Sequence, residues 1–417
     1  MKKRYGLLGA RLGHSFSKVI HERITGDNYD LIPLTEEEFD AFVPAREYAA
    51  LNVTLPYKQR VIPFLDEVDE RAAAIGAVNT VVNREGKLYG YNTDFDGVLG
   101  LMRRNGVDPA GKTVLILGTG GTHRTVTAVL RYCKAGEILV ASRTGKNGAL
   151  TYPQAMARKD VQIIINTTPC GMYPHVEDCP IELAGFPRLE AVLDVVYNPL
   201  RTRLVQNARA LGITAEGGLY MLVEQAVCAC ERFYDKPLGS QVTDEIFGWL
   251  AGQKTNIVLT GMPGAGKSHI GRLLAEATGR ALVDLDEEIV KTAGMPISEI
   301  FAKEGEAGFR DRETAELKKA AAQSGQIIAT GGGAILRDEN IAALKQNGLV
   351  FFIDRPLEAL QTGHGRPLSA DFEAVKKRYG ERYDRYLSTA DIQIENTGTP
   401  EEAALKIKEA MDAISGT

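Results

Sequence analysis

The chain has 417 residues, of which 44% are hydrophobic and 25% are charged. These values are ordinary for a soluble globular protein, and the length predicts two or three domains. A net charge of −5 argues against a protein that coats nucleic acid or an anionic membrane. There is no run of about 18 apolar residues to span a membrane and no signal-peptide pattern. With five scattered cysteines, we expect free thiols in a reducing cytoplasm.

Residues 1–250 alternate between strand-like and helix-like patterns. The expected strands are, in order, YGLLGA, LNVTLP, AVNTVVN, KLYGYNTD, KTVLILG, EILVAS, VQIIINTT and AVLDVVY. Helical stretches such as FDGVLGLMRRNG lie between several of them. This alternation predicts α/β structure.

A glycine-rich turn follows KTVLILG and opens a helix, as in a dinucleotide-binding fingerprint. His123 stands where the fingerprint has its third small residue, so the match is incomplete. After the next strand, Arg143 suits a ribose 2′-phosphate, whereas an acidic residue would bind a 2′-hydroxyl, and this favours NADP over NAD. The candidate cofactor-binding residues of the two turns are Gly118, Thr119, Gly120, Gly121, Ser142, Arg143, Thr144 and Lys146.

A set of polar residues flanks this cofactor-binding segment on both sides. They are Ser15, Ser17, Thr54, Lys58, Asn79, Asp94, Tyr197 and Gln225. Each one alone has an ordinary explanation, because serines cap helices and Asn and Asp form turns. In this order, from residue 5 to about 233, they resemble the motifs of shikimate dehydrogenase.

The resemblance implies a substrate-binding domain, residues 1–97 plus about 221–250, with a Rossmann NADP domain inserted at 98–220. It implies that Lys58 and Asp94 are the catalytic pair and that the other six polar residues contact the hydroxyls and carboxylate of the substrate. Glu70, Val195 and Gly218 match positions that touch the cofactor in the family. The sequence departs from the family at Ser142, often Asn, and at Lys18, usually Pro.

The chemistry of the pair agrees with these roles. Hydride transfer to the ring ketone of 3-dehydroshikimate creates an alkoxide, which needs a proton and a nearby positive charge. Lys58 can supply both, and Asp94 can orient it and hydrogen-bond the hydroxyl. A lysine beside a carboxylate stays charged, so it can act as an acid.

The second half begins after AGQKT, residues 251–255, which we predict to be a short flexible linker. Strand-like segments follow in the order NIVLTG, ALVDLD, QIIATGG, LVFFID and ADIQIEN. The last helix begins with Thr399 as its N-cap, Pro400 in its first turn and Glu402 in a capping box. This half is therefore also predicted to be α/β, with a parallel sheet.

GMPGAGKSH, which begins at Gly261, fits the phosphate-binding loop G-x-x-x-x-G-K-S. Its glycines let backbone N–H groups face phosphate oxygens. Lys267 places a charge on the transferring phosphoryl group, and Ser268 can bind Mg²⁺. The candidate ATP-binding residues are Gly264, Ala265, Gly266, Lys267, Ser268 and His269.

Further motifs follow the loop: Asp284 and Asp286 in VDLDEEI, Arg310 in GFRDRET, a triple glycine, and a basic stretch that begins at Arg366. We expect both aspartates at a strand end, where alternation gives them different roles. In this order, over residues 256 to about 413, the motifs resemble shikimate kinase. The resemblance implies that shikimate is held by Asp286, Arg310, Gly332 and Arg382. It also implies that Asp284 and Ser268 serve Mg²⁺ and that Arg366, in a compact lid, closes over ATP.

The two resemblances name consecutive reactions, so we predict a fusion that reduces 3-dehydroshikimate with NADPH and then phosphorylates shikimate with MgATP. One alternative is that one half only binds ligand or regulates. Another is a related specificity, such as quinate in the first half or gluconate in the second. Proximity of the halves permits transfer of shikimate between sites, but co-expression alone also explains the fusion. Oligomeric state is not predicted.

Overall fold

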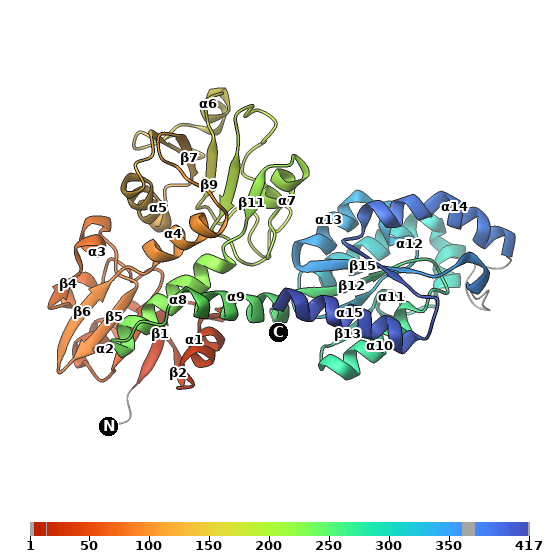
Figure 1. Ribbon diagram of the computed structural model, residues 1–417, viewed down its shortest axis with the longest axis horizontal. Coiled ribbons are helices and arrows are strands. Elements are labelled where there is room, and N and C mark those ends of the chain that lie inside the picture. The colour runs from red at the N-terminus through yellow and green to blue at the C-terminus, as the bar shows by residue number, and fades with distance from the viewer. Residues whose placement is uncertain (1–3, 14, 361–371, 416–417) are drawn as a thin grey trace. The chain divides into compact units, whose positions relative to one another are not determined.

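The computed structural model describes residues 4–13, 15–360 and 372–415. The chain divides into two compact units (Figure 1). The first comprises Met1–Met172, Asp178–Asn198 and Leu204–Phe247, and the second comprises Tyr173–Glu177, Pro199–Arg203 and Gly248–Thr417. Among the described residues, no helix is long and apolar enough to cross a membrane.

The first unit contains a mixed six-stranded sheet. Across the sheet its strands are β2 (Tyr29–Pro33), β1 (Tyr5–Gly9), β3 (Ala50–Val53), β5 (Thr80–Arg84), β6 (Lys87–Tyr91) and β4 (Glu67–Val68). Strand β5 runs antiparallel to β3 and β6, and the other pairs are parallel. Helices α1 (Ser17–Thr25), α2 (Glu36–Ala45) and α3 (Glu70–Ile75) and the 3-10 turn η1 (Ile62–Phe64) lie between these strands in the chain.

A second sheet of the same unit is entirely parallel. Across the sheet its strands are β11 (Thr214–Glu216), β10 (Ala191–Asp194), β9 (Ile163–Asn166), β7 (Thr113–Leu117) and β8 (Glu137–Ala141). Helices α5 (Gly121–Tyr132), α6 (Tyr152–Ala157) and α7 (Arg203–Ala210) lie between these strands in the chain. Helix α4 (Asp94–Arg104) precedes the first of them, and α8 (Leu219–Tyr234) follows the last. Val114 and Ile116 pack in one apolar cluster, and Leu115 and Leu117 pack in another. Strand β7 is therefore covered on both faces, which explains its continuous apolar run.

The second unit contains a third sheet, also entirely parallel. Across the sheet its strands are β13 (Leu282–Asp284), β14 (Ile327–Ala329), β12 (Asn256–Thr260), β15 (Gly348–Asp354) and β16 (Ile392–Glu395). Its helices are α10 (Lys267–Thr278), α11 (Leu285–Ala293), α12 (Ile297–Ala321, interrupted at Gly305), α13 (Asp338–Asn347), α14 (Phe372–Thr389) and α15 (Pro400–Ser415). Short 3-10 turns are η2 (Ala334–Leu336) and η3 (Leu357–Ala359). Helices cover both faces of this sheet (Figure 1).

The predicted α/β class is confirmed, and all thirteen strand-like segments contain strands at the expected places. The capping box of α15 is also present: Thr399 N donates to Glu402 Oε2, and Glu402 N donates to Thr399 Oγ1, both at 3.3 Å. The predicted flexible linker is wrong. Residues 251–254 form the last turn of α9 (Ser240–Lys254), because Thr255 N still donates to Ala251 O at 2.9 Å.

Candidate active sites

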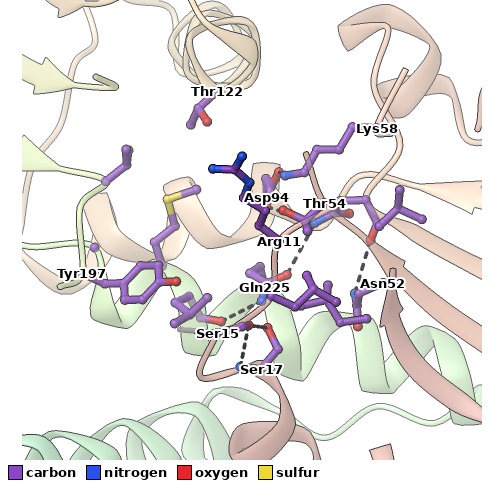
Figure 2. Close-up of a pocket in the computed structure, with 18 of the residues that line it drawn as sticks. Arg11, Ser15, Ser17, Asn52, Thr54, Lys58, Asp94, Thr122, Tyr197 and Gln225 are labelled. Carbon is purple, nitrogen blue, oxygen red and sulfur yellow. Dashed lines mark hydrogen bonds and ion pairs between the residues drawn. The ribbon is translucent and has the colours of Figure 1, made fainter. Parts of the chain in front are cut away.

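A cavity of about 350 Å³ opens in the first unit, at the carboxyl ends of β1 and β3 (Figure 2). Its walls also include the start of α4, one face of α8 and the first turn of α5. All eight polar residues that the sequence singled out line it: Ser15, Ser17, Thr54, Lys58, Asn79, Asp94, Tyr197 and Gln225. The fold thus brings together side chains that lie as much as 210 positions apart in the chain.

Lys58 and Asp94 form an ion pair inside this cavity, with Lys58 Nζ 2.5 Å from Asp94 Oδ2. Their side chains are only 24% and 13% exposed, so solvent screens the pair less than it screens an exposed one. Asn79 Nδ2 donates to the other carboxylate oxygen, Asp94 Oδ1, at 3.0 Å. Asn79 Oδ1 in turn accepts from Thr93 N at 2.8 Å. Asp94 is therefore fixed from two sides and holds the lysine ammonium in one place.

Close packing of α4 against α8 brings Asp94 and Gln225 to the same cavity. A β-carbon on Gly97 would lie 2.6 Å from Met221 O, and one on Gly100 would lie 2.9 Å from Glu224 Cγ. Only glycine admits such contacts, so the two helices approach more closely than side chains would permit. The motif DFDGVLG thus supplies Asp94 and the close contact of α4 with α8.

Another part of the cavity wall, formed by Ser15, Ser17 and Tyr197, carries hydroxyl groups. Ser15 Oγ donates to Ser17 Oγ at 3.0 Å and accepts from Ser17 N at 3.2 Å, which places both hydroxyls at the start of α1. The Tyr197 ring packs against Phe16, with ring centroids 5.4 Å apart. Burial raises the pKa of Tyr197, so its phenol stays protonated and can donate. This wall suits a polyhydroxylated, carboxylated ring.

Three polar residues of the cavity wall were not predicted: Arg11, Asn52 and Thr122. Asn52 could have been found, because it precedes Thr54 by two residues in the expected strand LNVTLP, where alternate residues share a face. Its Nδ2 donates to Asn79 O at 3.3 Å, and its Oδ1 accepts from the Tyr29 hydroxyl at 2.7 Å. No motif indicated Arg11, whose place depends on the course of the loop after β1.

The predicted dinucleotide turn lies between β7 and α5. Gly118 has φ +105°, a conformation that favours glycine, and a β-carbon there would lie 2.8 Å from Thr168 Cγ2. β-carbons on Gly120 and Gly121 would meet no atom within 4 Å, so the backbone there is open to a ligand. His123 Nδ1 lies 2.5 Å from Gly120 O, folded back on the turn. The turn and the start of α5 thus fit a dinucleotide diphosphate.

The neighbouring turn after β8 contains Ser142, Arg143, Thr144 and Lys146. Ser142 Oγ accepts from Gly145 N at 3.1 Å and tightens the turn. Arg143, Thr144 and Lys146 lie at the carboxyl end of the strand that pairs with β7, and Arg143 and Lys146 are exposed. This position is where a Rossmann fold binds the adenosine ribose, so the two basic residues fit a 2′-phosphate.

Of the three remaining cofactor positions, two lie at the cavity and one does not. Val195 and Gly218 both line the cavity, and a β-carbon on Gly218 would lie 2.2 Å from Val195 O. Here glycine lets α8 begin directly against the end of β10. Glu70, at the exposed start of α3, is not among the residues that line the cavity.

The phosphate-binding loop of the second unit joins β12 to α10. Gly261, Gly264 and Gly266 have φ values of +145°, +86° and +94°, which explains why these positions are glycine. Lys267 Nζ donates to Gly261 O at 2.8 Å and to Met262 O at 3.0 Å. The loop therefore curls around the ammonium group, the arrangement that a phosphate cradle requires.

Ser268 and Asp284 form a hydroxyl–carboxylate pair beside this loop. Ser268 Oγ donates to Asp284 Oδ2 at 2.5 Å, and Asp284 Oδ1 accepts from Asp286 N at 3.1 Å. The expectation that both aspartates end a strand is wrong. Strand β13 ends at Asp284, and Asp286 lies in the first turn of α11 because Asp284 caps that helix. Hydroxyl and carboxylate oxygens are the donors that Mg²⁺ prefers alongside phosphates.

The triple glycine after β14 is explained by packing rather than by φ. A β-carbon on Gly331 would lie 2.5 Å from Glu313 Oε1, and one on Gly332 would lie 2.7 Å from Pro263 Cδ. On Gly333 it would lie 2.2 Å from Arg310 Nη1. Each glycine thus leaves room for a different group of the site.

Two arginines converge on this turn. Arg310 Nη1 donates to Glu313 Oε2 at 2.6 Å, and Arg382 Nη1 donates to Gly332 O at 3.0 Å. Both arginines are 8% exposed. The predicted substrate residues Asp286, Arg310, Gly332 and Arg382 therefore gather around Gly331–Gly333. Arg366 lies outside the described residues.

Glu313 is a member of this cluster that the sequence analysis missed. It is fully buried, and burial raises its pKa although the Arg310 charge opposes the shift. Its spacing from Arg310, three residues along a helix, was the available signal. Glu313 holds one side of the guanidinium and Glu306 Oε1 accepts from Arg310 Nη2 at 3.3 Å, so that only the remaining N–H groups can face a ligand.

Comparisons with known proteins match both halves of the chain. The profile of the shikimate dehydrogenase substrate binding domain matches residues 7–81. The NADP(+) shikimate dehydrogenase of Clostridium perfringens (strain SM101) is 35% identical over 55% of this chain and 91% of its own length. This chain belongs to the shikimate dehydrogenase family. A relative of the same description from Geobacillus kaustophilus is 36% identical over 56% of this chain and 93% of its own.

Solved structures of the dehydrogenase family resemble the same part of the chain. A chorismate mutase/shikimate 5-dehydrogenase fusion from Clostridium acetobutylicum matches with a TM-score of 0.57 and 33% identity, covering 60% of this chain and 96% of its own. The Thermus thermophilus shikimate 5-dehydrogenase in complex with NADP(H) and shikimate matches with a TM-score of 0.53 and 30% identity, covering 59% and 98%. The shikimate kinase profile matches residues 263–412. The chain therefore joins dehydrogenase and kinase domains as a bifunctional shikimate-pathway enzyme, which confirms both predicted resemblances.

Proposed function

We propose that residues 1–250 reduce 3-dehydroshikimate to shikimate with NADPH and that residues 256–417 phosphorylate shikimate to shikimate 3-phosphate with MgATP. Within the first part, residues 1–97 and about 221–250 form the substrate-binding subdomain, and residues 98–220 bind NADP. The observation that carries the first reaction is the Lys58–Asp94 pair, set among hydroxyl and amide groups in one cavity. The cluster of two arginines around Gly331–Gly333, beside a phosphate-binding loop, carries the second.

In the first reaction, NADPH supplies a hydride to the ring ketone when it is bound. Lys58 donates a proton to the developing alkoxide, and its charge stabilises that oxygen before transfer is complete. Asp94 keeps the ammonium in position and accepts a hydrogen bond from a ring hydroxyl. Ser15, Ser17 and Tyr197 donate to the substrate carboxylate, while Thr54, Asn79 and Gln225 bind the remaining ring oxygens.

In the second reaction, Arg310 and Arg382 bind the carboxylate of shikimate, because guanidinium groups pair well with carboxylates. Asp286 and Gly332 orient the ring, and MgATP supplies the phosphoryl group. Lys267 and the loop amides stabilise the charge on that group as it transfers. Ser268 and Asp284 would hold Mg²⁺, and Arg366 would close over the nucleotide.

The cofactor assignment rests on the chemistry of each turn. Arg143 and Lys146 favour a 2′-phosphate, and Val195 and Gly218, which line the cavity, fit the rest of the cofactor. Glu70 remains a family-matched cofactor position outside the cavity lining. The described cysteines are all free, which supports a reducing compartment such as the cytoplasm. The partners are small molecules.

The test is to give the full chain 3-dehydroshikimate, NADPH and MgATP together. We expect shikimate 3-phosphate to accumulate with one NADPH oxidised per molecule formed. Lys58→Ala should stop the first step and leave the kinase active on added shikimate, and Lys267→Ala should stop only the second. If Lys58→Ala leaves the reductase rate unchanged, or if quinate or gluconate proves the better substrate of its half, the proposal is wrong for that half.

A further inference from the structure

Arg11 is a charged residue of the dehydrogenase cavity to which nothing above gives a role. It lies two residues after β1, in the loop that leads to Ser15, and its side chain lines the cavity and is exposed. The loop around it is held by backbone bonds from Ala10 N to Leu55 O, at 3.3 Å, and from Ser15 N to Leu12 O, at 3.1 Å. The position of Arg11 is therefore set by the fold.

The Arg11 guanidinium has no hydrogen-bond or ion-pair partner in the described part of the chain. Arg11, Lys58 and Asp94 are the charged residues that line the cavity, and Lys58 is already paired with Asp94 at 2.5 Å. The cavity therefore presents one guanidinium whose charge no neighbouring carboxylate balances. Such a group favours an anion.

Three anionic groups belong in this unit if the proposed function holds: the carboxylate of the substrate, the diphosphate of the dinucleotide, and its 2′-phosphate, which Arg143 and Lys146 already account for. Figure 2 shows the Arg11 guanidinium on the Thr122 side of the cavity, away from Ser15 and Ser17. Thr122 is the second residue of α5, whose N-terminus carries unpaired N–H groups and a partial positive charge. Beside it, the backbone of Gly120 and Gly121 is open.

We propose that Arg11 binds the diphosphate of NADP from the side of the substrate-binding subdomain, opposite the N-terminus of α5. This inference rests on the proposed function of the first half. Two donors from different subdomains then hold one diphosphate between them. Arg11 contacts a part of the cofactor that NADPH and NADH share, whereas Arg143 contacts the 2′-phosphate that NADPH alone carries.

The experiment measures equilibrium binding of NADPH and of NADH to the full chain by nucleotide fluorescence, without substrate. We expect Arg11→Ala to raise the Kd of both nucleotides by the same factor, about 10- to 100-fold for a lost bond to a charged group. Arg11→Lys should recover part of the affinity, because it keeps the charge but not the fork of donors. Arg143→Ala should weaken NADPH alone.

Arg131→Ala is the matched control. It removes the same charge from the last turn of α5, at the opposite end of that helix, and should leave both Kd values unchanged. Calorimetry of shikimate binding tests the alternative that Arg11 binds the substrate carboxylate instead. If Arg11→Ala weakens shikimate and leaves both nucleotides at wild-type affinity, the guanidinium binds the carboxylate and the inference is overturned. Unchanged affinity for all three ligands overturns it as well.

These outcomes are distinguishable from failure of the proposed function. If wild-type protein bound neither nucleotide, the dehydrogenase assignment itself would fail, and the variants would not be needed. Because Arg11 is exposed and has no partner among the described residues, its replacement should not affect folding. Urea unfolding of Arg11→Ala checks this directly.

Discussion

Gly333→Ala tests the carboxylate site of the kinase with a single methyl group. A β-carbon on Gly333 would lie 2.2 Å from Arg310 Nη1 and 2.3 Å from Arg310 Cζ. The backbone there has φ −108°, a negative value that does not require glycine. The guanidinium must therefore move, and it is 9% exposed and bonded at 2.6 Å to Glu313, which is 1% exposed.

The displaced guanidinium loses its bond to Glu313 and cannot meet the substrate carboxylate in the same place. A hydrogen bond to a charged group contributes about 1.5–3 kcal/mol, and every 1.4 kcal/mol changes an equilibrium constant about tenfold. We therefore expect the KM for shikimate to rise by about 10- to 150-fold, measured by ADP release at saturating MgATP.

Gly380→Ala is the matched control, because Gly380 lies in α14 with no atom within 4 Å of its added β-carbon. It should leave the KM unchanged and stabilise the helix by up to about 1 kcal/mol. The reductase activity of the same chain reports whether Gly333→Ala has disturbed the rest of the protein. A wild-type KM for shikimate in Gly333→Ala would refute the packing argument.

Three further outcomes are expected. Lys58→Ala should lower the reductase kcat by about 10²- to 10⁴-fold with a smaller change in KM, and a loss confined to KM would contradict its role as acid. Burial lowers the pKa of His21 from 6.5 to about 4, so between these values the unfolded chain binds a proton that the folded protein does not, and stability falls as pH is lowered. From pH 7 to pH 5 this loss is about 2 kcal/mol, and urea unfolding should show it in the wild type and not in His21→Gln. Chelation with EDTA should stop the kinase, because we propose that its phosphoryl donor is MgATP, and should leave the reductase rate unchanged. Equal loss of both activities would count against a Mg²⁺ requirement confined to the kinase half.

The strands that sequence patterns missed share one property. They are β2, β4 and β11, and each lies at the edge of its sheet. An edge strand is covered less completely than a central one, so its apolar signal is weaker, and β2 even ends in Pro33, which central strands exclude. Central strands such as β7 were found because burial on both faces requires a continuous apolar run.

Site residues likewise differ in whether a local pattern indicates them. The phosphate-binding loop and the capping box of α15 depend on backbone geometry within a few residues, so their spacing alone indicates them. Glu313 lies within GFRDRET, but only Arg310 of that motif was given a role, and Arg11 belongs to no motif that was used. Their importance comes from what lies beside them: a buried guanidinium for Glu313 and a cavity wall for Arg11.

The sequence by itself determined the α/β class, the central strands and the phosphate-binding loop, because these follow from local periodicity and turn chemistry. The polar residues proposed for both sites came from the family resemblances instead. Only the tertiary structure shows that Asp94 contacts Lys58, 36 residues away, and that α4 packs closely on α8 at Gly97. It also decided why three glycines follow β14, since each leaves space for a group from a distant part of the chain. Contacts between distant segments depend on how whole elements pack, and no local pattern records that packing.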